Sequence, residues 1–112
     1  MNTNIIVNHY SYRVQWSSED EEYVGTCAEL PGLSWLDESP AATLNGIQKV
    51  VREAVSDMEA NGEKVPEPYA DRAYSGRFVV RLTPEEHRRL ALEAAEAGVS
   101  LNRMAVHKLT VN

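Results

Sequence analysis

The sequence predicts an α+β protein built from two successive parts, a β-β-β-α part and a strand-helix-helix part. Three observations carry this prediction. Tyr10 to Trp16 alternates apolar and polar residues at a period of two, which is typical of a strand with one buried face. Apolar residues at helical spacing follow between Ser39 and Gly62. A second alternating segment, residues 77–82, leads directly into two short helical patterns.

The first part begins with three short strands. The acidic run Ser17 to Glu22 predicts a hairpin loop between the first strand and a second one at Tyr23 to Leu30. Pro31-Gly32 then indicates a turn, because Pro presets φ and Gly permits a positive φ. Residues 34–36 are predicted to form the third strand.

The helix that follows has a clear start and end. Ser39 is a good N-cap, Pro40 suits the first helical position, and Asn61-Gly62 provides a C-terminal stop. Gly46 inside the helix costs about 1 kcal/mol relative to Ala, which indicates close packing against a neighbour. The apolar stripe consists of Leu44, Ile47, Val51, Ala54, Val55 and Met58.

A connection rich in proline separates the two parts. Pro66 and Pro68 stiffen it and disfavour helix at the residues before them. A fourth edge strand has room here, so the predicted order of the first part is β-β-β-α(-β). We place the domain bounds at 1–68, the linker at 69–75 and the second domain at 76–112.

The helices of the second part are equally well delimited. Thr83-Pro84-Glu85-Glu86 forms a capping box, Gly98 ends the first helix, and Ser100 caps the second. The predicted inner faces are Leu90, Ala91, Ala94, Ala95 and Ala97 on the first helix, and Leu101, Met104, Ala105 and Leu109 on the second.

Charge differs sharply between the two parts. Residues 1–75 hold five Lys/Arg against thirteen Asp/Glu, a net charge of −8, whereas residues 76–112 hold six against four, a net charge of +2. This asymmetry indicates two functional surfaces, one of which can approach an anion, although a solvated surface without a ligand explains it as well.

Composition also excludes several classes of protein. No stretch approaches the roughly 20 apolar residues of a membrane helix, and the start lacks a signal peptide, so we expect a cytoplasmic protein. The single cysteine, Cys27, excludes an internal disulfide and a Cys-based zinc site, and is best interpreted as a small buried hydrophobe. We expect no metal and no cofactor.

The segment 77–82 is a strand without an obvious partner. Phe78, Val80 and Leu82 share one face, and the opposite face carries Arg77, Val79 and Arg81.

Only helices follow this strand, so it pairs either with the first sheet or with its own copy in a second chain. Antiparallel pairing around a two-fold axis near Val79 would set Arg77 opposite the second chain's Arg81. Like charges directly opposite each other destabilise a ribbon, so their presence favours an anionic ligand that binds to them. DNA is such a ligand, because a two-stranded ribbon fits its major groove and arginine reads guanine there. Solvated arginines that deter edge aggregation are the alternative.

The strand 77–82, the Thr83 helix start and the turn at Gly98 to Leu101 together resemble the ribbon-helix-helix DNA-binding domain. The resemblance covers about a third of the chain. It implies that Arg77, Val79 and Arg81 face base edges in the major groove. It also implies that a backbone phosphate binds at the start of the second helix, through Ser100, Leu101, Asn102 and Arg103. Val79 departs from the many relatives that carry a polar residue there, and either reads a thymine methyl or only favours the strand.

With this tail in place, the front part resembles the N-terminal domain of HicB-type antitoxins, which has a truncated RNase H-like fold. The features that match are the aromatic strand, the acidic hairpin, Glu29-Leu30-Pro31-Gly32-Leu33 and the helix that starts at Ser39. The two resemblances together imply an antitoxin that neutralises a small basic HicA-like ribonuclease toxin and represses its own operon. They imply a homodimer through the strand 77–82, with a tetramer through the front domain left open.

Three other functions are alternatives to this one. A solitary regulator without a toxin and a structural dimerisation protein are consistent with the same residues. A two-metal nuclease would need several converging carboxylates, for which Glu29 and Asp37 are the candidates, and no nucleophile-base pair is evident. Surface or packing roles explain His9, His87 and His107. We therefore expect no enzymatic activity.

Overall fold

The structure, a computed structural model, describes residues 3–111 and divides into two compact units. The N-terminal unit is Met1–Tyr74 and the C-terminal unit is Ser75–Asn112. The elements of the first are helices α1 and α2, strands β1 to β3 and a short 3-10 turn η1, and those of the second are helices α3 and α4. The expected α+β class is confirmed.

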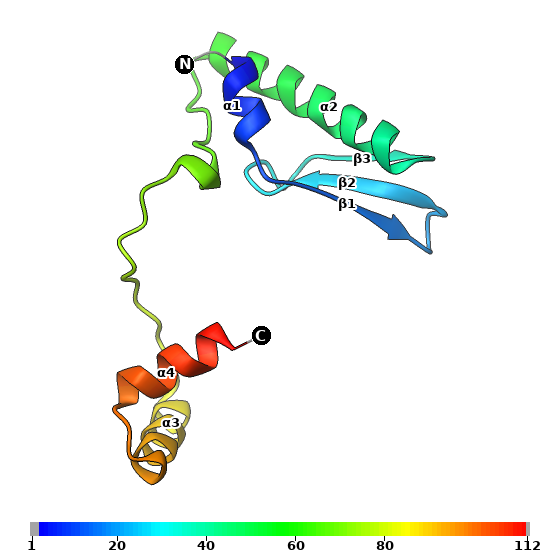
Figure 1. Ribbon diagram of the computed structural model, residues 1–112. Helices are drawn as coiled ribbons and strands as arrows, with labels where there is room; N and C mark the ends of the chain where they lie inside the picture. Colours follow the sequence, from blue (N-terminus) through cyan, green and yellow to red (C-terminus); the bar gives the residue numbers. More distant parts are fainter. Residues whose placement is uncertain (1–2, 112) are drawn as a thin grey trace. The chain divides into compact units, whose positions relative to one another are not determined.

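A three-stranded antiparallel sheet forms the base of the N-terminal unit. Its strands are β1 (Tyr12–Ser17), β2 (Glu22–Cys27) and β3 (Ser34–Asp37), in the order β1-β2-β3. Helices α1 (Thr3–His9) and α2 (Pro40–Ala60) both lie on one side of this sheet (Figure 1). The acidic hairpin predicted between the first two strands is present at residues 18–21.

Helix α2 begins and ends where the sequence predicts. The Ser39 hydroxyl accepts a hydrogen bond from the Ala42 N–H at 3.1 Å, and Gly62 follows the end of the helix with a φ of 72°. Of the predicted stripe, Ile47, Val51 and Val55 are buried, and Ala54 and Met58 are half-buried. Leu44 is exposed, and Thr43 beside it is buried instead. Thr43 is tolerated inside because its hydroxyl donates to the Ser39 carbonyl at 2.7 Å.

Two glycines let α2 approach the sheet closely. A Cβ on Gly25 of β2 would lie 3.0 Å from side-chain carbons of Thr43 and Ile47. A Cβ on Gly46 of α2 would lie 2.0 Å from Nε1 of Trp35, an impossible contact for a real atom. The close packing predicted at Gly46 is therefore confirmed, and its neighbour is the indole of β3.

The core of the N-terminal unit includes an element that the sequence analysis missed. Helix α1 covers residues for which the sequence predicts no element, and its Val7 is fully buried. Val7 packs with Tyr10 and Cys27, and the remaining members of the core are Ile47, Val51 and Val55 of α2. The prediction that Cys27 is a small buried hydrophobe is confirmed, and burial raises the pKa of its thiol.

The predicted fourth strand is wrong. After α2 the described chain holds only the 3-10 turn η1 (Tyr69–Asp71) before the C-terminal unit begins. The segment is instead held by side chains, since the Tyr10 hydroxyl donates to the Pro66 carbonyl at 2.7 Å. His9 Nδ1 and Asp71 Oδ2 lie 2.7 Å apart. These two contacts hold the connection against the end of α1 without any strand pairing.

The C-terminal unit consists of α3 (Pro84–Ala97) and α4 (Leu101–Thr110). Its predicted caps are all present: the capping box at Thr83, the left-handed Gly98 with a φ of 68°, and the Ser100 cap. Of the predicted inner faces, Ala94 alone is fully buried among the residues that the structure describes. No helix within residues 3–111 has the length and apolar character needed to cross a membrane.

Candidate functional site

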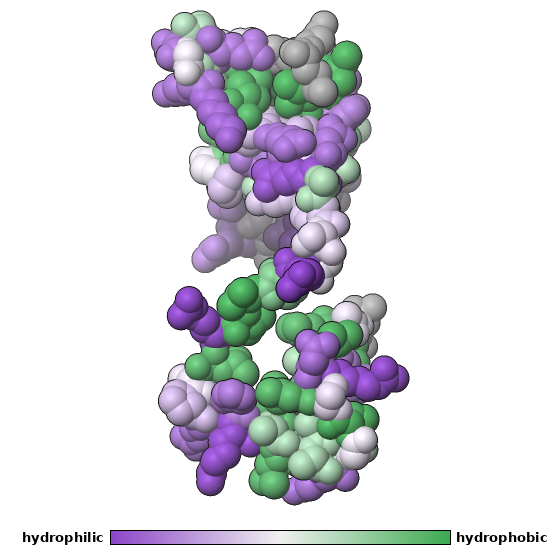
Figure 2. Space-filling view, turned by 90° about the vertical axis from the view of Figure 1, so that its left-hand side faces the viewer, coloured by the Kyte–Doolittle hydropathy of each residue, from purple (hydrophilic) through white to green (hydrophobic). Residues whose placement is uncertain are grey.

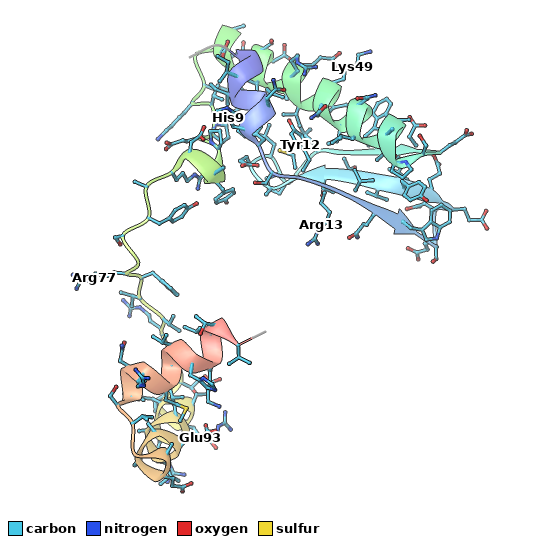
Figure 3. The ribbon with its side chains drawn as sticks, viewed as in Figure 1. His9, Tyr12, Arg13, Lys49, Arg77 and Glu93 are labelled. Carbon is cyan, nitrogen blue, oxygen red and sulfur yellow. The ribbon has the colours of Figure 1, made fainter. Side chains whose placement is uncertain are left out.

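The segment Arg77 to Leu82 is exposed along its whole length. Phe78 and Val79 have exposed fractions of 76% and 84%, and the Arg77 side chain extends away from the backbone (Figure 3). The segment has no regular secondary structure in a single chain. A strand that pairs with a second copy cannot form in one chain, so the prediction of a strand at 77–82 stays untested.

An apolar groove lies beside this segment in the C-terminal unit. The groove has a volume of about 570 Å³. Its apolar wall is formed by Val80, Leu82, Leu90, Leu101, Ala105 and Leu109. Figure 2 shows hydrophobic side chains gathered on the surface of this unit. At its rim Lys108 Nζ forms an ion pair with Glu93 Oε1 at 3.1 Å, which joins α3 to α4.

The described residues of the C-terminal unit, 75–111, bury little apolar surface. Ala94 is its one fully buried apolar side chain among the described residues, whereas Leu92 and Leu109 expose about three-fifths of theirs. Units of fewer than about 40 residues usually need a disulfide, a metal or oligomerisation to be stable. The chain has a single cysteine, and it lies in the other unit.

The start of α4 offers hydrogen-bond donors to an anion. The Arg103 N–H already donates to the Ser100 hydroxyl oxygen at 3.0 Å. The N–H groups of Leu101 and Asn102 have no partner within the helix, because the first turn of any helix lacks preceding carbonyls. The helix dipole adds partial positive charge at this end. Of the four predicted phosphate ligands, Leu101 and Asn102 are thus best placed to donate from the backbone.

The buried carboxylate of Glu29 has a structural role. It is 7% exposed and joins distant segments: Oε1 accepts from the Ser11 N–H at 2.9 Å, and Oε2 accepts from the Tyr69 N–H at 3.0 Å. Burial acts to raise the pKa of this carboxyl group, but these N–H donors outweigh it and lower the pKa. No sequence signal could have shown this role, since both partners are backbone groups far away in the chain.

The residues weighed for catalysis do not converge. Asp37 accepts from Trp35 Nε1 at 3.1 Å and from the Glu38 N–H at 2.8 Å. His87 and His107 are exposed on their helices, as expected. Within residues 3–111, no group of three or more His, Cys, Asp and Glu side chains could hold a metal ion.

Fold and surface together define an α+β protein with an acidic N-terminal unit and a C-terminal helix pair that leaves its apolar face uncovered. Comparison with protein families found a match. Residues 59–109 match the family model described as the HicB family. The match spans the end of α2, the connection and nearly all of the C-terminal unit. Searches of curated proteins and of solved structures found no match.

Proposed function

We propose that the protein is an antitoxin that neutralises a basic HicA-like ribonuclease toxin and represses its own operon. The observation that carries the proposal is the uncovered apolar groove of the C-terminal unit, next to an exposed segment with arginines at both ends. The match of residues 59–109 to the HicB family model supports a role in a toxin-antitoxin system. A location in the cytoplasm and the lack of enzymatic activity are parts of the same proposal.

The proposed C-terminal unit is a ribbon-helix-helix homodimer. Val80 and Leu82 line the groove, so the same strand in a second chain would cover both grooves if the two strands pair about a two-fold axis. Pairing would also provide partners for the backbone groups of residues 77–82. In this arrangement Phe78, Val80 and Leu82 join the new core, and Arg77, Val79 and Arg81 point outward from the ribbon.

The outward face of this ribbon is proposed to bind the major groove of operator DNA. Arg77 and Arg81 would read guanine edges, and Val79 would lie between them. The start of α4, from Ser100 to Arg103, would bind a backbone phosphate and so fix the position of the ribbon. Within residues 3–111 no ion pair engages either arginine, so both charges are available to DNA.

Replacement of Arg81 with Ala is expected to weaken specific operator binding by about 1–3 kcal/mol, because one guanine contact is lost from each chain. Fluorescence anisotropy with the DNA upstream of the gene measures the effect. The matched control is Arg88→Ala, which removes the same charge from an exposed position on α3. Equal affinities of the Arg81→Ala and wild-type proteins for the operator would exclude the assignment to the major groove.

The N-terminal unit is proposed to adopt a truncated RNase H-like fold and to bind the toxin. Its net charge of −8 over residues 1–75 suits a basic partner, because complementary charge speeds encounter and orients the two proteins. A tetramer formed through this unit would be a dimer of the C-terminal dimers.

Co-expression tests the toxin half of the proposal. A small basic protein encoded beside this gene is expected to arrest growth alone, and to be harmless and co-purify when the antitoxin is present. The C-terminal unit carries the DNA contacts, so Arg81→Ala should neutralise the toxin normally. Toxicity that persists beside the intact antitoxin would contradict this half.

Two other functions make different predictions. A solitary regulator binds operator DNA but has no neighbouring toxin. A structural dimerisation protein has no DNA affinity, whereas contacts to phosphates give affinity that falls steeply with salt. The salt dependence of DNA binding and the co-expression result therefore separate all three functions.

A further inference from the structure

Three aromatic side chains share one side of the sheet in the N-terminal unit. Trp16 of β1 is paired with Tyr23 of β2, and Tyr23 is paired with Asp37 of β3. Side chains two residues apart in a strand lie on the same face, so Trp35 shares the face of Asp37. Trp16, Tyr23 and Trp35 therefore lie on the face that α2 covers, where Gly25 contacts Thr43 and Ile47.

This aromatic group is only partly covered by α2. Trp16 and Trp35 remain 53% and 38% exposed. The Trp16 and Tyr23 rings are 5.1 Å apart and meet edge to face at 70°, so one supports the other. The Trp35 indole is oriented by its hydrogen bond to Asp37. Rigid, exposed aromatic rings in a small unit indicate a surface for a partner.

The stretch of sequence that holds these rings carries one sign of charge. Lys, Arg and His are absent from Val14 to Gln48, a stretch that holds all three aromatic residues. Exposed or half-exposed carboxylates from the hairpin, Glu19 to Glu22, and from the end of β3, Asp37 and Glu38, lie at the same end of the sheet. Arg13, the nearest cation along β1, extends from the side of the sheet opposite α2 (Figure 3).

We propose that this surface, defined by Trp16, Tyr23, Trp35 and the carboxylates of the hairpin, binds an arginine-bearing segment of a protein partner. The inference rests on the proposed function, since it places the toxin contact on one end of the sheet. Guanidinium groups stack on the face of tryptophan and also form hydrogen bonds with carboxylates. Lysine forms weaker stacks because its ammonium is compact and strongly hydrated. The aromatic rings therefore select arginine, and the carboxylates supply attraction at longer range.

Binding of capped nona-arginine and nona-lysine peptides to the full chain tests the inference without a toxin. Titration calorimetry at about 0.15 M salt limits screened, non-specific attraction. The wild-type protein is expected to bind nona-arginine about fivefold more tightly than nona-lysine. Trp16→Leu, which keeps an apolar side chain but removes the ring, should lose about tenfold in affinity for nona-arginine and equalise the two peptides.

A matched pair of charge variants separates this surface from general acidity. Glu22→Gln lies at the hairpin and should weaken nona-arginine binding severalfold, whereas Glu63→Gln, in the connection after α2, should change it less than twofold. Absence of an arginine preference in the wild type, or equal losses in Trp16→Leu and Glu63→Gln, would overturn the inference.

The co-expression experiment distinguishes the proposed arginine-binding surface from the proposed antitoxin function. A neighbouring toxin that remains fully bound by Trp16→Leu would overturn this inference and leave the antitoxin function intact. A selective loss of peptide binding in Trp16→Leu would support the surface even if no neighbouring toxin exists, and would then assign it to another arginine-bearing partner.

Discussion

The Val80→Asn variant is expected to be monomeric and to lose specific DNA binding. Val80 lines the groove of the C-terminal unit, and in the proposed ribbon it packs in the core between two chains. Burial of an amide without hydrogen-bond partners costs about 1–3 kcal/mol, and a two-fold dimer contains the substitution twice. We therefore expect the dissociation constant of the dimer to rise about a thousandfold.

Analytical ultracentrifugation measures this change, and Val79→Asn is its matched control. The two substitutions are identical and adjacent, but Val79 points outward in the ribbon, so Val79→Asn should remain dimeric. Such adjacent positions can differ only if the segment is a strand with two unlike faces. Equal dimerisation by both variants would show that residues 77–82 do not form this ribbon.

The local signals of the sequence predicted much of the fold. Helix ends were predictable because caps depend on a few adjacent residues, as at Ser39, Thr83 and Gly98. The error at Leu44 has a different cause. The periodicity of α2 locates its apolar face only to within one residue, and the close approach of α2 at Gly25 favours the smaller Thr43 inside.

Features that depend on distant contacts were not predictable. Helix α1 is too short to show periodicity, and it is stabilised by burial of Val7 in the core rather than by its sequence. The connection after α2 has the apolar periodicity of neither a helix nor a strand. Individual hydrogen bonds to Glu29 and His9 hold it in place, and no local pattern in the sequence reveals them. Of the candidate site, the sequence predicted the arginines and caps, but not the groove that α3 and α4 form together.

Replacement of Glu29 with Ala is expected to lower the free energy of unfolding of the N-terminal unit by about 2–5 kcal/mol. The substitution leaves the N–H groups of Ser11 and Tyr69 without their acceptor, and loss of a part-buried hydrogen bond to a charged group costs about 1–3 kcal/mol. Both tryptophans, Trp16 and Trp35, lie in this unit, so urea unfolding followed by their fluorescence reports on it selectively. The control is Glu63→Ala, an exposed carboxylate on the same unit, which should change stability by less than about 0.5 kcal/mol.

The same carboxylate also makes the effect of the substitution depend on pH. The pKa of Glu29 is lower in the folded protein than its ordinary value, so the unfolded state binds a proton more readily. Its contribution is therefore complete above the ordinary carboxyl pKa of roughly 4.3 and is lost as the pH falls through the lowered folded value. The difference in unfolding free energy between the wild type and Glu29→Gln, which cannot titrate, should be constant from about pH 7 to pH 5 and shrink toward pH 3. A difference that stays constant down to pH 3 would mean that the charge of Glu29 does not stabilise the fold, and that its shape alone holds Ser11 and Tyr69 together.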